Sequence, residues 1–174
     1  IKMLNDEVAR QKGINKEEEK SANYRVEVSH HIDALYVGDD ALRIEMHKTI
    51  NKVKSRDQQQ ILLQEFADRY GTVKEEIKLY IEAKYLEHLL KTKGIESFKE
   101  TPEMVKLNFS EERTQNMSAK ELYHLVSSLA PKFKLDYINR KVHMTIKRAD
   151  FKNSYIDLFV YIFSSNGISP LIPQ

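Results

Sequence analysis

The chain has 174 residues, of which 41% are hydrophobic and 31% charged, with a formal net charge of +2. This balance predicts a soluble globular domain with a sizeable core. A charge so near neutral is not by itself an argument for nucleic-acid binding. The sequence contains no cysteine, which excludes disulfides and thiolate chemistry and fits a reducing cytoplasm. No apolar run reaches the roughly 18 residues that span a bilayer, so we expect a cytoplasmic protein without a membrane partner.

The first residues are expected to form an arm rather than part of the main domain. The chain begins with Ile1 instead of methionine, which suggests a fragment of a longer protein. Helical spacing of apolar residues covers 1–12 and ends at Gly13, and residues 15–23 are almost entirely polar. We therefore predict an N-terminal helix with a charged linker over 1–23, belonging to a preceding region, and a single domain over 24–174.

The next segment predicts a strand and then a helix. Residues 24–28 alternate as YRVEV, which is typical of a short strand. Asp39 and Asp40 can cap a helix that runs to about residue 53. The residues expected on its buried stripe are Leu42, Met46, Thr49, Ile50 and Val53.

Residues 58–94 contain two further helices, each closed by a glycine, and the rest of the chain is organised around them. Ser55 can cap the first, which Gly71 ends, and Gly94 ends the second. The linker over 71–74 is short, so the two should pack as a helical hairpin. The spacing that predicts the second helix comes from Ile77, Ile81, Tyr85 and Leu89.

After Gly94 the apolar period changes from helical to alternating. Two strands are predicted around 95–97 and 104–109, and two more over 133–137 and 142–146, joined by a tight turn at 138–141. Between the pairs, Ser118 and Glu121 form a capping box before a helix that ends at Pro131. Its inner stripe is expected to be Leu122, Leu125, Val126 and Leu129.

A last apolar helix should begin at an Asp150 cap and end at Gly167, with two prolines beyond it. Hairpins thus alternate with helices, which favours an α+β fold with helices packed on a small antiparallel sheet. We predict one compact domain of this class with an N-terminal helical arm.

Motifs for catalysis are missing from the sequence. The five glycines are isolated, so no loop can cradle a phosphate. None of the six histidines fits a zinc-protease pattern, and the adjacent pair His30 and His31 would point to opposite faces of a strand. There is no G-x-S-x-G elbow. We therefore expect no enzyme activity, no metal and no cofactor in this fragment, although a small-molecule enzyme with a polar pocket that the sequence does not reveal is a further alternative.

Two acids on the first organising helix stand out physically. Glu65 and Asp68 are three residues apart and project from one helix face. Asp68 lies in the last turn, where the helix dipole makes an acid unfavourable by roughly 0.3–1 kcal/mol. The pair could be solvated surface acids, matched by a nearby lysine such as Lys74, or could contact an arginine of a partner.

The only basic concentration covers residues 131–153, with seven cations against two acids. These side chains could bind phosphates, or they could protect a sheet edge from aggregation. The candidate phosphate contacts are Lys132, Lys134, Arg140, Lys141, Lys147 and Arg148.

The sequence also resembles a known family. LLQEFADRYG, EEIKLYIEAKYLEHLLKTKGIESF and MVKLNF are similar to the C-terminal domain of the bacterial transcription-repair coupling factor family. The signature is Asp68-Arg69-Tyr70-Gly71 with Gly94-Ile95 at this spacing, and residues 24–110 carry most of the resemblance. Thr72-Val73-Lys74 departs from the prolines that often follow the first glycine in the family.

The resemblance implies that the parent protein is an ATP- and magnesium-dependent DNA translocase that displaces stalled RNA polymerase and recruits nucleotide excision repair. It implies that this domain is regulatory and docks on an N-terminal module similar to the B subunit of the excision nuclease. Docking would mask the surface that binds the damage-recognition A subunit. The implied interdomain contacts are Glu65, Asp68 and Arg69. The alternative is an accessory nucleic-acid-binding domain that uses the basic 131–153 hairpin.

Overall fold

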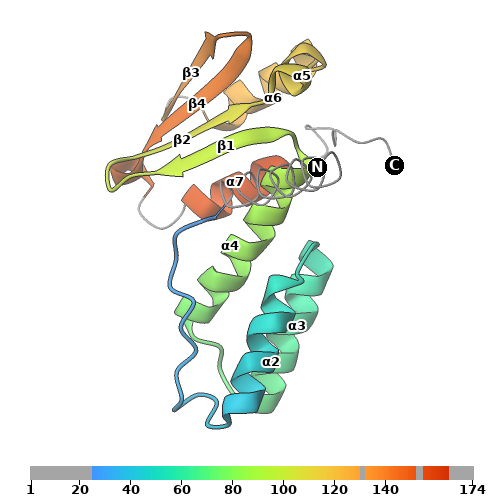
Figure 1. Ribbon diagram of the computed structural model, residues 1–174, viewed down its shortest axis with the longest axis vertical. Helices are drawn as coiled ribbons and strands as arrows, with labels where there is room; N and C mark the ends of the chain where they lie inside the picture. Colours follow the sequence, from blue (N-terminus) through green and yellow to red (C-terminus); the bar gives the residue numbers. More distant parts are fainter. Residues whose placement is uncertain (1–24, 130–131, 152–154, 165–174) are drawn as a thin grey trace, which may run out of the picture.

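The computed structural model describes residues 25–129, 132–151 and 155–164. The predicted helix over 1–12, the boundary at residue 23, the helix end at Gly167 and the proline-containing tail lie outside them. Figure 1 shows the described chain as a helical part formed by α2 and α3 and a part that carries the sheet, with α4 running between them.

The helical part begins with two well-capped helices. Helix α2 spans Asp40–Asn51, and the Asp39 carboxylate accepts hydrogen bonds from the N–H groups of Ala41 and Leu42 at 2.8 and 3.3 Å. Helix α3 spans Arg56–Tyr70, and the Ser55 hydroxyl accepts from the N–H of Gln58 at 3.1 Å. Such side-chain acceptors satisfy N–H groups that have no partner within the helix. Both predicted caps are confirmed.

Helix α4 spans Glu75–Thr92 and follows α3 after a short linker. It packs against α2, α3, α7 and strand β1, and so it is apolar on more than one side. The predicted hairpin of α3 and α4 is confirmed. The four residues whose spacing predicted α4 are all buried: Ile77, Ile81, Tyr85 and Leu89. Among the described helices, none combines the length and apolar character required to cross a bilayer.

Four strands form one antiparallel sheet in the order β1-β2-β4-β3. They are β1 (Ile95–Glu100), β2 (Met104–Phe109), β3 (Phe133–Ile138) and β4 (Lys141–Lys147). Asn139 and Arg140 take φ values of 53° and 65°, as a two-residue hairpin turn requires. Both predicted hairpins are confirmed, and with them the α+β class.

One face of the sheet is covered and the other is open. Helix α7 (Tyr155–Ser164) packs against the covered face, where Phe159 meets Phe98 and Phe163 meets Phe109 at ring-centroid distances of 6.2 and 6.3 Å. The alternate side chains of the same strands form the opposite, polar face. This polar side is called the open face below; its central positions are Lys99, Lys106, Thr145 and Lys134.

Between the two hairpins lie helices α5 (Glu111–Gln115) and α6 (Ala119–Leu129). Sequence patterning missed α5, which is a single turn capped by Ser110. Arg113 is buried and forms an ion pair of 2.7 Å with Glu121. Only half of the predicted capping box is present: the N–H of Glu121 donates to the Ser118 hydroxyl, but its carboxylate binds Arg113.

The predicted strand over 24–28 is wrong for the residues that the structure describes there, because 25–28 are extended but unpaired in any ladder. Their amides have side-chain acceptors instead: the N–H of Val26 donates to Glu87 and that of Glu27 to Glu100, both at 2.9 Å. The Tyr155 hydroxyl donates to the same Glu100 carboxyl, whose pKa is raised by burial.

Three smaller predictions also fail. Thr49 is exposed, because α2 buries a narrower stripe around Met46 and Ile50. Val126 on α6 is 41% exposed. Asp150 ends a 3₁₀ turn, Arg148–Asp150, rather than capping the last helix, which begins at Tyr155. Propensity does not distinguish these alternatives, since tertiary packing decides them.

The buried Arg113–Glu121 pair gives a stability prediction. Arg113→Met should lower the free energy of unfolding by about 3 kcal/mol, because it leaves the Glu121 charge buried without its cation. Urea unfolding measures the change. Arg140→Met is the matched control: its ion pair with Glu111, at 3.5 Å, is 76% and 44% exposed, so the change should stay within about 0.5 kcal/mol. Equal effects of the two substitutions would contradict a stabilising role for the buried pair.

Candidate interaction surface on helix α3

Helix α3 separates a buried side from a charged side. Leu62 and Phe66 are each 4% exposed and lie in the core. Glu65, Asp68 and Arg69 are exposed on the other side. The structure therefore brings the three predicted interdomain residues together on one accessible face, within a single helical turn.

Glu65 has only a weak local partner. Its carboxylate lies 3.4 Å from the Arg69 guanidinium, and the two side chains are 51% and 54% exposed. A solvated pair of this kind, four residues apart on a helix, contributes about 0.3–0.5 kcal/mol. An arginine from another surface could replace Arg69 at little cost.

Asp68 accepts a hydrogen bond from a neutral side chain. Its carboxylate accepts a hydrogen bond of 2.9 Å from the Gln64 amide, one turn earlier. Lys74, which the sequence suggested as a cation for this acid, instead forms an ion pair of 3.2 Å with Asp33. The backbone N–H of Leu35, and then Lys74, hold the pKa of Asp33 below its usual value. Asp68 therefore has no ion pair among the described residues.

An apolar groove lies next to the acids. Ile61 is 67% exposed. It borders a groove of about 230 Å³ between the end of α2 and α3, lined also by Val53, Leu62 and Glu65. The sequence pattern did not single out Ile61 as a candidate contact residue. Because Ile61 is followed by two further apolar residues, Leu62 and Leu63, the sequence does not show which of the three faces solvent.

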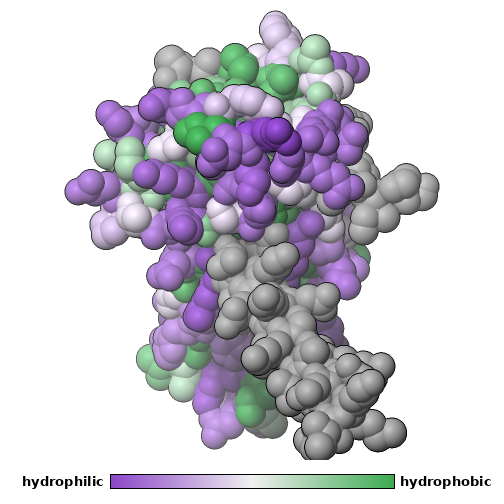
Figure 2. Space-filling view, turned by 45° about the horizontal axis from the view of Figure 1, so that its top comes forward, coloured by the Kyte–Doolittle hydropathy of each residue, from purple (hydrophilic) through white to green (hydrophobic). Residues whose placement is uncertain are grey.

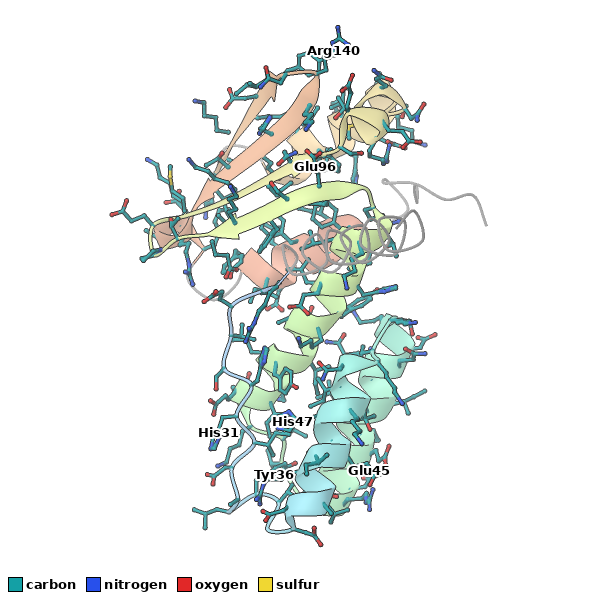
Figure 3. The ribbon with its side chains drawn as sticks, in the orientation of Figure 1. His31, Tyr36, Glu45, His47, Glu96 and Arg140 are labelled. Atoms are coloured by element: carbon teal, nitrogen blue, oxygen red, sulfur yellow. The ribbon has the colours of Figure 1, made fainter. Side chains whose placement is uncertain are left out.

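The end of α3 is fixed from outside the helix. The Tyr36 hydroxyl donates to the carbonyl of Gly71 at 3.0 Å, and it lies 3.4 Å from that of Phe66. Figure 3 shows Tyr36 between the extended segment before α2 and the helices. Because carbonyls at a helix end otherwise lack partners, this contact stabilises the turn that carries Asp68.

The six candidate phosphate contacts do not form one cluster. Arg140 lies at the tip of the β3–β4 hairpin (Figure 3), paired with Glu111. Lys141 lies 2.7 Å from Glu96, and Arg148 donates to the carbonyl of Thr101 at 3.1 Å. Lys132, Lys134 and Lys147 remain exposed near the open face.

A further hollow, near ionisable groups, measures about 380 Å³ and is lined in part by Arg56, Gln59 and Glu82. Arg56 lies 3.0 Å from the Glu82 carboxylate, which also accepts from the Gln59 amide. The three groups satisfy one another, which is the usual arrangement for buried polar residues. The network is therefore explained by its role in the fold, and no ligand is needed to account for these polar groups.

Two of the histidines, His30 and His47, pack against Tyr80. His30 stacks on Tyr80 with ring centroids 4.6 Å apart, and the Nδ1 of His47 lies 2.9 Å from the Tyr80 hydroxyl. Burial lowers the pKa of both histidines; Lys84 and Arg25 add to the effect at His30, and His31 at His47. Within the described residues, no group of three or more metal-ligating side chains is placed to hold an ion.

This cluster predicts a pH dependence. Because the pKa of His30 lies below the ordinary histidine value of 6.5, the unfolded chain binds the proton more tightly than the folded one. The free energy of unfolding should therefore fall as the pH drops below about 6.5. His30→Phe keeps the stacked ring and should reduce this loss between about pH 7 and pH 5, as urea unfolding would show. The exposed control His31→Gln should follow the wild type. A parallel loss in His30→Phe and wild type would contradict the prediction.

The fold and the exposed face of α3 together define the structural class of this chain. The chain is a compact α+β domain with an exposed face on α3 that combines two acids and an apolar groove.

Comparison then identifies the family. The chain belongs to the TRCF domain family, whose model matches residues 26–120. It is 22% identical over 149 residues to the transcription-repair-coupling factor of Staphylococcus haemolyticus, covering 84% of this chain and 13% of that protein. The identity to the protein of the same name from Bacillus subtilis is 23% over 146 residues, covering 83% and 12%. The chain thus spans about an eighth of the length of these relatives.

A solved structure shares the fold. The crystal structure of a C-terminal domain of transcription-repair coupling factor superposes with a TM-score of 0.66 and 17% identity, covering 79% of this chain and 86% of that one. The resemblance seen in the sequence and the predicted fold class are both confirmed.

Proposed function

We propose that this chain is the C-terminal regulatory domain of a longer transcription-repair coupling factor. In this proposal the parent protein is a DNA translocase that uses ATP and magnesium, displaces stalled RNA polymerase and recruits nucleotide excision repair. Family membership and the small share of the relatives that the chain covers support this assignment. The domain itself would be non-catalytic.

The regulatory role would be autoinhibition. The α3 face docks on the N-terminal module of the same polypeptide, the one similar to the B subunit of the excision nuclease. That contact masks the surface that recruits the damage-recognition A subunit. The single observation that carries this proposal is the exposed pair Glu65 and Asp68 beside the Ile61 groove.

The geometry suits an arginine from the module. Its guanidinium would form charge-assisted hydrogen bonds with Glu65 or Asp68, and its apolar stem would lie against Ile61. Glu65 would leave its solvated partner Arg69 and pair with the arginine of the module, which is less hydrated in the interface. Arg69 would then be free to meet an acid on the module. A coupling of about 1–3 kcal/mol is typical of such switches, so binding of polymerase and DNA elsewhere could release the domain.

Charge reversal tests the proposal. In the longer protein, Glu65→Lys with Asp68→Lys should raise the affinity for the A subunit by about 5- to 150-fold, because the masking contact is lost. Titration calorimetry with the purified A subunit measures the change.

The matched control reverses two exposed acids elsewhere, Glu103→Lys with Glu112→Lys, in the β1–β2 turn and on α5. This variant changes the net charge equally and should bind the A subunit as the wild type does. If the α3 variant also bound it no better than the wild type, docking through this face would be excluded.

A further inference from the structure

The open face of the sheet carries a row of lysines that the linear sequence does not reveal. Lys99 on β1 lies directly opposite Lys106 on β2. Lys106 in turn faces Thr145 on β4, and Thr145 faces Lys134 on β3. Since paired residues of antiparallel strands project to the same side, three ammonium groups and a hydroxyl form one line across all four strands.

This row is electrostatically unfavourable in the free domain. Like charges directly opposite each other destabilise a sheet. Lys99 and Lys106 are exposed, and neither has an ion-pair partner among the residues that the structure describes. Only Lys134 has an acid nearby, Asp136 at 3.6 Å, and that lysine is 75% exposed.

Protection of sheet edges does not account for the row. Lysines on edge strands prevent aggregation, and β1 and β3 are the edges of this sheet. Lys106, however, lies on the inner strand β2 with a partner on both sides, and Lys147 ends the other inner strand, β4. Their charges therefore require another explanation.

A hollow extends the row at one end. It measures about 270 Å³. Its lining combines Lys132, Lys134, Thr145 and Lys147 with the apolar residues Met104, Phe133 and Ile146 and one acid, Asp150. Three cations and a hydroxyl donor around one hollow are the groups that bind phosphate oxygens. Figure 2 shows the part of the molecule that carries the sheet turned toward the reader, and its surface is mainly hydrophilic with small separate apolar areas.

We propose that the open face binds the sugar–phosphate backbone of duplex nucleic acid through Lys99, Lys106, Lys134 and Lys147, with Thr145 as a neutral donor. The surface differs from the 131–153 segment of the sequence, since it adds two lysines from β1 and β2. It omits Arg140, Lys141 and Arg148, which have intramolecular partners.

Two features favour nucleic acid over an acidic protein. Protein interfaces are depleted in lysine and depend on buried apolar anchors. None of the large hydrophobic side chains exposed among the described residues lies in the lysine row. The absence of aromatic rings from the row also argues against stacking with single strands, and so for duplex.

The dimensions agree with a duplex backbone. Neighbouring strands are about 4.8 Å apart, so the row from β1 to β3 extends about 14 Å. One strand of B-form DNA carries a charge for about every 3.4 Å of helix axis, so a row of this length can contact several phosphates. Contacts of this kind fix position and affinity without reading sequence.

Binding of a fluorescent duplex of mixed sequence tests the proposal. Anisotropy is measured with the 174-residue chain at salt concentrations from about 50 to 200 mM. Lys99→Gln with Lys106→Gln and Lys134→Gln should weaken binding at least about tenfold at the lowest salt and reduce the slope of log K against log salt by about 2–3. Circular dichroism checks that the exposed substitutions leave the fold intact.

The control variant removes the same charge outside the sheet: Lys48→Gln with Lys52→Gln and Lys54→Gln, all exposed at or just after the end of α2. It should bind the duplex nearly as the wild type does. Equal losses in the two variants, or no binding by the wild type at about 50 mM salt, would overturn the proposal. So would tighter binding of a polyglutamate peptide than of duplex, which would assign the face to an acidic protein. Neither outcome bears on docking through α3.

Discussion

The structure depends on the burial of helix α4. Nine of its residues are buried, and they face α2 and α3 at one end and α7 with the sheet at the other. Fully burying a large apolar side chain stabilises a fold by about 1.5–3 kcal/mol. No other described helix contacts so many elements (Figure 1). Without α4 the helical part would have no core to pack on, because α2 and α3 each present only two or three buried residues.

This arrangement separates two surfaces that have different chemistry. The α3 face is acidic with an apolar groove, and the open face of the sheet is a row of lysines. Because α4 packs against both parts in one core, each surface lies on a rigid scaffold. Preorganised surfaces of this kind lose less conformational entropy when a partner binds. In our two proposals, the domain contacts a neighbouring module and a nucleic-acid backbone through separate surfaces.

The helices and hairpins could be predicted because local signals specify them. Ser55 and Asp39 are caps, Gly71 and Gly94 are stops with positive φ, and the strands alternate clearly. The segment over 25–28 could not be predicted, since its amides bond to Glu87 and Glu100, far away in sequence. Helix α5 is one turn long and leaves no periodic pattern.

The candidate sites show the same limit. Glu65 and Asp68 are neighbours on one helix, so their shared face follows from spacing alone. Ile61 was indistinguishable from its buried neighbours, because the groove beside it requires α2. The lysine row depends on strand order and register, which align residues 99, 106 and 134 on β1, β2 and β3 with β4 between the last two. Linear charge counting instead selected Arg140, Lys141 and Arg148, whose partners only the fold supplies.

The central claim is that α3 is the docking face of this domain. The most direct measurement is a titration of the ¹⁵N-labelled chain with the N-terminal module, followed by amide chemical shifts. Docking through α3 predicts that the largest shifts occur along this helix from Ile61 to Arg69 and around the end of α2, with little change in the sheet. Shifts confined to the open face or to α5 and α6, with α3 unaffected, would contradict the claim.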